Sequence, residues 1–169
     1  VLMGSLTGIT LFGNQTWYQG DLSSSDGSES GDAFGEKLAT GDFDADGYDD
    51  LVIGTPWDEY SGWFDLGVVN VVYGTFSGLD ASGNQTLVRP PDIWVLYEDC
   101  FGMALATGDF DADGYDDLAA AAIGGNWEWG EVYIIYGGAA GLSASSGEWQ
   151  HWQSISYGIL DHSYNGRFG

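Results

Sequence analysis

Short apolar runs alternate along this chain with polar stretches rich in glycine, serine and aspartate. Runs of β-branched and aromatic residues, each ended by glycine, lie at 68–73 and 132–136, and continuous apolar runs lie at 51–53 and 118–123. Runs of this length are typical of β-strands, and the continuous ones of strands that are buried on both faces. No segment places apolar residues at helical spacing, so we predict an all-β protein. The predicted strands are 34–41, 51–53, 68–73, 85–88, 101–108, 118–123 and 132–136, with weaker ones near Trp17 and Trp152.

The strand pattern is part of an internal repeat. The segment GDFDADGYDDL begins at Gly41 and again at Gly108, 67 positions later, and Phe34-Gly35 recurs at the same offset. Other matched segments are offset by 63 or 70 positions. These differences fall between strands, where a loop absorbs a few residues at little entropic cost. A period of four short strands predicts the blades of a β-propeller. The alternative is a β-sandwich that carries a chance duplication.

The period divides the chain into two full units and one partial unit. Residues 34–100 form one predicted blade, and 101–169 form a second blade with the start of the next repeat. Residues 1–33 align with 68–100 and are predicted to be the second half of a preceding blade. About two and a half blades fall short of the roughly three repeats that stable arrays need. We therefore expect the sequence to be part of a longer chain.

Charge and composition restrict the classes of partner. The formal net charge is −23, and the positive residues are Lys37, Arg89 and Arg167. A chain without a basic patch is not expected to bind nucleic acid or an anionic membrane surface. No run approaches the roughly 18 apolar residues of a membrane-spanning helix, so no membrane insertion is predicted. With 44% hydrophobic residues the chain is expected to fold rather than remain disordered, and its single cysteine forms no intrachain disulfide.

The repeated segment has the spacing of a calcium-binding loop. Acidic residues occupy positions 1, 3, 5 and 9, glycine occupies position 6, and position 7 offers a main-chain carbonyl oxygen. Calcium takes six to eight oxygen ligands in flexible geometry, whereas magnesium prefers a strict octahedron. We therefore predict two calcium sites. The predicted ligands are Asp42, Asp44, Asp46, Tyr48 and Asp50 in the first loop, and Asp109, Asp111, Asp113, Tyr115 and Asp117 in the second.

The loop is not an EF-hand, because position 12 is apolar where an EF-hand has a bidentate glutamate. Asp49 and Asp116 lie between ligand positions and are expected to face solvent or to support the ligands. The loops contain no histidine or cysteine, which are the ligands that zinc and copper prefer, so neither ion is expected at these sites.

These residues resemble a known family. Phe34-Gly35, the acidic loop and the apolar run that ends in Gly54-Thr55-Pro56 resemble the FG-GAP repeat, which builds the β-propeller of integrin α subunits and of many bacterial surface or secreted proteins. The second copy departs from the pattern, since 121–125 replaces the Gly-Thr-Pro stretch. The resemblance implies that the calcium loops are structural and lie on the propeller face away from the usual ligand face.

Function and location follow from these expectations. Extracellular calcium modules bind at about 10⁻⁴ to 10⁻³ M, so such sites would be mostly empty at cytosolic calcium levels. We therefore expect an extracellular or cell-surface protein. Its expected work is adhesion or recognition of a protein or glycan, without catalysis. Two alternatives stay open: a structural subunit that self-associates into a surface layer or filament, and a non-catalytic part of a larger polysaccharide-active enzyme.

Further residues are candidates for function. Aromatic residues crowd the segments 57–64 and 127–129, which are predicted either to bind the ligand or to pack between blades. Asn14 and Asn84 match the glycosylation sequon, and duplication of one turn sequence explains them equally well. His151 and His162 have no partner at metal-ligand or nucleophile spacing. No catalytic residue is predicted.

Overall fold

The computed structural model describes part of the chain in detail. The described residues are 1, 3–5, 8–11, 13–22, 27–60, 65–89, 99–123, 130–143, 149–155 and 158–161. Within them the elements are β1 (Met3–Ser5), β2 (Gly8–Thr10), the 3₁₀ turn η1 (Gln19–Asp21), β3 (Lys37–Gly41), β4 (Asp50–Thr55), β5 (Val68–Tyr73), β6 (Asp80–Leu87), β7 (Ala104–Gly108), β8 (Asp117–Ala122), β9 (Glu131–Ile135), β10 (Gln150–Ile155) and β11 (Gly158–Asp161).

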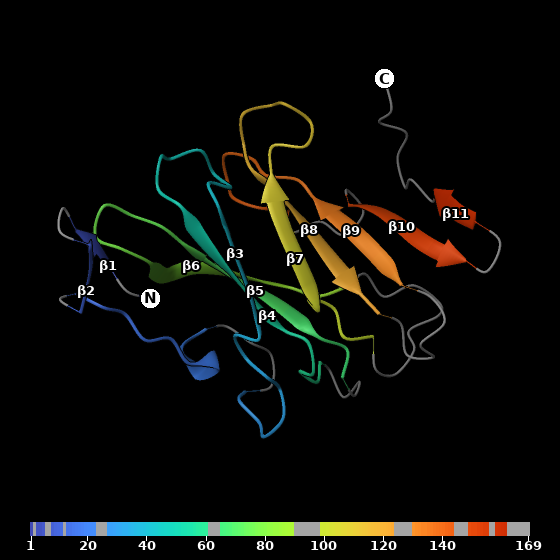
Figure 1. Cartoon of the computed structure of the whole chain (residues 1–169), viewed down its shortest axis with the longest axis horizontal. Helices are drawn as coiled ribbons and strands as arrows, with labels where there is room; N and C mark the ends of the chain where they lie inside the picture. Colours follow the sequence, from blue (N-terminus) through green and yellow to red (C-terminus); the bar gives the residue numbers. More distant parts are fainter. Residues whose placement is uncertain are drawn as a thin grey trace.

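The described strands form two main antiparallel sheets and one small hairpin. The first sheet has the order β3-β4-β5-β6, and the second has the order β11-β10-β9-β8-β7. Among the strands that the structure describes, β1 pairs with β2 alone. Figure 1 shows the two main sheets side by side, with the hairpin beyond β6 and with β11 at the far edge of the second sheet. The all-β prediction is confirmed. The first repeat is an antiparallel four-stranded meander, as a propeller blade requires, and the second repeats this meander in β7–β10 with β11 added at its edge.

Most predicted strands are present, and a few boundaries and elements differ. β5 lies at its predicted position, and β6 and β10 are found where outer strands were expected near residues 85 and 152. The strand predicted near Trp17 is wrong, because Trp17 lies in irregular backbone just before η1. The hairpin of β1 and β2 and the fifth strand β11 were not predicted, since their short sequences carry little pattern.

The Phe-Gly pairs begin turns rather than strands, which corrects the predicted starts at residues 34 and 101. β3 and β7 start three residues later than expected. Ala33 and Gly35 adopt positive φ angles of 58° and 82°, and Cys100 and Gly102 adopt 51° and 88°. The second turn presses against the first sheet: a Cβ added to Gly102 would lie 2.8 Å from Val69 Cγ2. The glycine is therefore needed for a close approach of backbone to sheet.

The main core lies between the two sheets. Val52, Val69 and Val71 on one face of the first sheet pack with Leu118 and Ile135 on the facing side of the second, and all five are fully buried. Phe43 and Phe101 fill the two ends of this interface. Burial of large apolar side chains between stacked sheets is the main stabilising contribution to the junction.

The other face of the first sheet packs on the N-terminal segment. Leu22, Ile53 and Val72 form a second buried cluster, against which Trp17 and Phe34 pack. The first sheet is therefore covered on both faces, as its continuous apolar strands predict.

The outer face of the second sheet is more exposed than its repeat counterpart. Val69 is fully buried, whereas Val132, at the matched position, is 40% exposed. Phe43 is likewise fully buried, whereas Phe110 at the matched position is 50% exposed. The face of the first sheet that carries Val69 is therefore covered by the second sheet. Among the described residues, the matching face of the second sheet, which carries Val132, is not covered.

Candidate metal centres

Both acidic loops are tight connections between the first two strands of their sheets. The first joins β3 to β4, and the second joins β7 to β8. Gly47 and Gly114 adopt φ angles of 92° and 96°, which side chains rarely tolerate. Ala45 and Ala112 also adopt positive φ angles, of 56° and 63°. The two loops therefore fold alike, and the repeated glycine is required by the turn.

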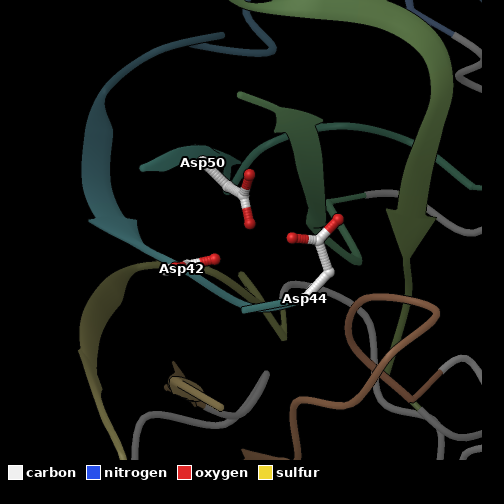
Figure 2. A group of neighbouring side chains, drawn as sticks. All are labelled: Asp42, Asp44 and Asp50. Carbon is white, nitrogen blue, oxygen red and sulfur yellow. The ribbon is translucent and has the colours of Figure 1, made fainter. Parts of the chain in front are cut away.

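The first loop gathers three carboxylates. One oxygen each from Asp42, Asp44 and Asp50 lies within 4.8 Å of the others, and Figure 2 shows the three side chains pointing toward one another. Asp42 and Asp44 come from the loop itself, and Asp50 is the first residue of β4. Alternate loop positions thus converge on the buried end of the strand, as the sequence predicts.

Main-chain amides hold the loop in this shape. Asp46 donates its N–H to Asp42 Oδ1 at 3.0 Å and to Asp44 Oδ1 at 3.1 Å. Gly47 donates to Asp42 Oδ2 at 3.0 Å. The side chain of Asp46 accepts a hydrogen bond from the N–H of Tyr48 at 2.9 Å. The structure therefore gives Asp46 a role in shaping the turn and does not include it among the three grouped carboxylates, so its ligation stays a prediction, as does that of the Tyr48 carbonyl.

Asp50 is the buried member of the three carboxylates and is held by two main-chain N–H groups. Its Oδ2 accepts the N–H of Phe43 at 2.9 Å, and its Oδ1 accepts the N–H of Gly74 at 2.8 Å. Burial raises the pKa of the Asp50 carboxyl to about 6, the two N–H donors oppose the rise, and the nearby Asp44 and Asp42 carboxylates add to it. A bound cation would relieve this repulsion.

The second loop repeats the arrangement. Asp109, Asp111 and Asp117 each offer a carboxylate oxygen within 4.8 Å of the others. Asp117 accepts the N–H of Phe110 at 2.7 Å and that of Gly137 at 2.9 Å. Burial raises the pKa of the Asp117 carboxyl, as it does for Asp50. The remaining predicted ligands of this loop are held as in the first: Asp113 donates its N–H to Asp109 Oδ1 at 3.0 Å and accepts the N–H of Tyr115 at 3.0 Å.

The donor set fits a hard divalent cation. Each cluster offers carboxylate oxygens with no nitrogen or sulfur ligand, and one of the three carboxylates in each is buried. Calcium and magnesium are the cations that prefer such oxygens, and a flexible loop favours calcium. Gly74 and Gly137, whose N–H groups hold the buried aspartates, were not among the predicted site residues. They are the glycines that end the β-branched runs 68–73 and 132–136, and this repeated position is the signal that could have identified them.

The other functional candidates are only partly placed. Trp57 and Tyr60 follow β4, at the end of the sheet opposite the acidic loop, because β4 begins at that loop. Trp63, Phe64, Trp127, Trp129 and the side chains of both histidines lie outside the described residues. Asn14 is exposed, and Asn84 lies within β6 with a partly buried side chain. In the part of the chain that the structure describes, no helix is long and apolar enough to cross a membrane.

Comparisons with known proteins agree with this architecture. The family model for the FG-GAP repeat matches residues 34–62 and 101–141, which contain both acidic loops. The chain is 34% identical over 131 residues to integrin alpha-PS2 of Drosophila melanogaster. The aligned region covers 74% of this chain and 9% of that protein. It is 28% identical over 135 residues to human integrin alpha-7, which covers 79% of this chain and 11% of that protein.

A second group of relatives carries a different name. The chain is 35% identical over 115 residues to phosphatidylinositol-glycan-specific phospholipase D of Rattus norvegicus, which covers 64% of this chain and 14% of that protein. The chain therefore spans a small part of the length of each of these relatives.

Proposed function

Since the chain is an integrin-like FG-GAP repeat protein, we propose that it forms part of a calcium-stabilised, extracellular β-propeller that recognises a protein ligand and catalyses no reaction. The family model and the integrin relatives support the fold and the recognition role. The two acidic loops support the calcium requirement. The predicted ligands of both loops enter this proposal unchanged, with two ions per chain.

The observation that carries the proposal is the paired geometry of the loops. Each brings three carboxylates within 4.8 Å, and each places the buried aspartate under two main-chain N–H donors. Without a cation, the clustered negative charges repel one another. With one, the ion joins the hairpin loop to the start of the second strand. Its role is therefore structural: it fixes the turn between the first two strands of each blade.

The size of this effect is set by mass action. At a calcium concentration about ten times the dissociation constant, a site that binds only the folded state adds about 1.4 kcal/mol. Two such sites add about 3 kcal/mol, which is a large part of the 5–15 kcal/mol typical of a folded domain. Dissociation constants near the millimolar range are typical of extracellular modules, and this supports a location at the cell exterior.

We place ligand recognition at the end of the blades opposite the calcium loops. Trp57 and Tyr60, which belong to the first of the crowded aromatic segments in the sequence, are at that end. Aromatic side chains offer large contact areas to proteins and to sugar rings. The integrin relatives favour a protein ligand, and a glycan is the alternative.

Binding of extracellular proteins and glycans to immobilised chain tests this placement. Trp57→Ala and Tyr60→Ala should weaken binding, whereas Phe76→Ala should not, because Phe76 is an exposed aromatic residue at the calcium-loop end. Equal losses in all three variants would contradict the placement.

We also propose that residues 1–33, 34–100 and 101–169 are a half blade, a blade, and a blade with the start of the next repeat. In this arrangement a further FG-GAP repeat covers the outer face of the second sheet, where Val132 and Phe110 are exposed. The matched residues Val69 and Phe43 are buried by the second sheet, so the same kind of partner fits both faces.

The phospholipase relatives favour one alternative function. A segment of this kind can form the non-catalytic part of a larger enzyme, since the matched relative is named as a phospholipase. This alternative shares the calcium-stabilised blades and differs in what the rest of the protein does. Self-association into a layer or filament is a further alternative, which sedimentation of the purified chain would detect.

Calcium stoichiometry tests the proposal. Competition with a chromophoric chelator should show two ions per wild-type chain and one ion for Asp44→Asn and for Asp111→Asn. Asp49→Asn is the matched control, because Asp49 lies in the first loop outside the grouped carboxylates and should leave two ions bound. A chain that binds no calcium, or an Asp44→Asn variant that still binds two ions, would overturn it.

A further inference from the structure

The two acidic loops are joined directly by a pair of hydrogen bonds. Asp116 of the second loop donates its N–H to the carbonyl oxygen of Asp42 at 3.0 Å, and its Oδ2 accepts the N–H of Asp42, also at 3.0 Å. Asp42 is the first grouped carboxylate of the first loop, and Asp116 directly precedes Asp117, the buried carboxylate of the second. Asp116, which lies between the predicted ligands Tyr115 and Asp117 of the second loop, is therefore hydrogen-bonded to the backbone of Asp42 in the first loop.

A second chain of hydrogen bonds runs between the two buried aspartates. Phe43 donates its N–H to Asp50 at 2.9 Å, and the carbonyl oxygen of Phe43 accepts the N–H of Gly138 at 3.0 Å. Gly137, the neighbour of Gly138, donates its N–H to Asp117 at 2.9 Å. The buried carboxylates of Asp50 and Asp117 are thus linked through Phe43 on one side and Gly137-Gly138 on the other.

Packing around Asp116 leaves little room for independent movement. A Cβ added to Gly41 would lie 3.0 Å from Asp116 Oδ2, and one added to Gly137 would lie 3.0 Å from the carbonyl oxygen of Phe43. Thr107 also donates from its hydroxyl to the carbonyl oxygen of Thr40 at 2.6 Å, just before the two loops begin. A shift in the backbone of one loop therefore displaces atoms of the other.

The first repeat provides an internal comparison. Asp49 is the residue matched to Asp116, and it is exposed, whereas Asp116 is partly buried. The carboxylate of Asp49 accepts no hydrogen bond from the described part of the chain. The link is therefore a property of the junction between the two loops and does not follow from the loop sequence alone.

We propose that Asp116 is a positioning residue that couples the two calcium loops, so that an ion in either loop increases the affinity of the other. The inference rests on the proposed function, because it requires both loops to bind calcium. An ion orders the loop that holds it, and the hydrogen bonds through Asp116 carry part of that ordering to the second loop. The second ion then binds a loop whose conformational entropy has already been reduced.

Electrostatics acts in the opposite direction. An ion in one loop reduces the negative potential that attracts an ion to the other loop. Between separate solvent-accessible loops this term is screened over about 8 Å at 0.15 M ionic strength. The hydrogen bonds are contacts at 3.0 Å and are not screened in this way. Positive coupling at physiological salt is therefore the expected sign, with about a fivefold increase in the affinity for the second ion, at the low end of typical coupling between sites.

The test is a calcium-binding titration by calorimetry at 0.15 M salt on four forms of the full chain. Wild type should bind two ions, the second about fivefold more tightly after statistical correction. Asp116→Ala removes the side-chain acceptor but keeps the main-chain bonds between the loops, so it should bind two ions with clearly weaker coupling than wild type. Asp116→Asn keeps an oxygen acceptor of the same shape and should retain most of the coupling. Asp49→Ala, the control at the matched position, should behave as wild type.

The outcomes separate this inference from the proposal on which it rests. Two independent ions in wild type, or unchanged coupling in Asp116→Ala, would overturn the role of Asp116 while leaving the calcium sites intact. If Asp116→Asn and Asp116→Ala lost coupling equally, the charge of Asp116 rather than its hydrogen bond would cause the coupling. This result would also overturn the inference. A chain that binds no calcium would refute the calcium sites themselves. Melting of each variant in chelator identifies any loss of folding.

Discussion

Gln85 donates a hydrogen bond from its side-chain amide to the carbonyl oxygen of Leu142 at 3.0 Å, across the junction between the two sheets. The same contact occurs one junction earlier, where Gln15 donates to the carbonyl oxygen of Leu79 at 2.7 Å and accepts its N–H at 2.9 Å. At the junction between the two sheets, the hydroxyl of Tyr73 also links Gln85 and Leu142: it donates to the side chain of Gln85 and accepts the N–H of Leu142 at 3.1 Å. The repeated glutamine is therefore a contact between successive units.

This contact predicts a selective sensitivity to glycine substitution. Gly141 and Gly83 share a φ angle of 86°, so alanine is strained by about 1–2 kcal/mol at either position. A Cβ at Gly141 would in addition overlap the Tyr73 hydroxyl, whereas nothing lies within 4 Å of a Cβ at Gly83. Gly141→Ala should therefore lower the free energy of unfolding by about 1–3 kcal/mol more than Gly83→Ala. Urea unfolding followed by tryptophan fluorescence measures both, and equal losses would contradict the contact.

Arg89 should be the most important positive residue for stability. It is buried and pairs with Asp99 at 2.8 Å and with Glu131 at 3.3 Å, and it also donates to the Tyr133 hydroxyl. Removing one member of a buried ion pair typically costs about 3–5 kcal/mol, because the remaining charge loses its partner. Lys37→Ala is the control, since its pair with Glu36 is exposed and such pairs contribute about 0–1 kcal/mol. An Arg89→Ala variant as stable as Lys37→Ala would show that this network does not hold the sheets together.

The two matched phenylalanines should differ in their contribution to stability. Phe43 is fully buried in the core between the sheets, and Phe110 is 50% exposed. Phe43→Ala should cost about 3–5 kcal/mol, and Phe110→Ala less than half of that. Chemical unfolding in saturating calcium measures both values. In a longer chain in which a further blade covers the second sheet, the cost of Phe110→Ala should rise toward that of Phe43→Ala.

Stability without calcium should depend on pH in an unusual direction. The pKa of Asp50 is raised to about 6 from an ordinary 3.8, so the folded chain holds this proton more tightly than the unfolded chain. The contribution of Asp50 to the free energy of unfolding in chelator should therefore rise as the pH falls from about 7 to about 4. Calcium competes with the same proton, so the stability gained from calcium should shrink over that interval. A calcium increment that stays constant from about pH 7.5 to about pH 5 would contradict this link.

The strands and the acidic loops could be predicted from the sequence because both depend on local pattern. Continuous apolar runs identified β4 and β8, a β-branched run identified β5, and the alternating aspartates identified the clusters around Asp50 and Asp117. The duplication strengthened each prediction, since a feature found twice in register is unlike a chance pattern. The structure groups three carboxylates in each loop, and ligation by Asp46, Tyr48, Asp113 and Tyr115 stays a prediction.

What the sequence missed depends on contacts between distant residues. The Phe-Gly pairs were predicted as strand starts because their apolar character fits a strand, yet Gly102 is needed where a turn presses on Val69 of the other sheet. Trp17 matches an outer strand in sequence but packs against the second face of the first sheet. Asp116 and Asp49 are the same residue in the same motif, and only the neighbouring loop distinguishes them.

A thermal melt across a calcium titration tests the central claim, that the two acidic loops are structural calcium sites. At about ten times the dissociation constant, two sites should raise the melting midpoint by about 6–11 °C for a chain of this size. Magnesium should raise it less, because the flexible loops favour calcium. A variant that carries both Asp44→Asn and Asp111→Asn should show little calcium dependence. An unchanged midpoint in wild type, or an equal rise in the double variant, would contradict the account.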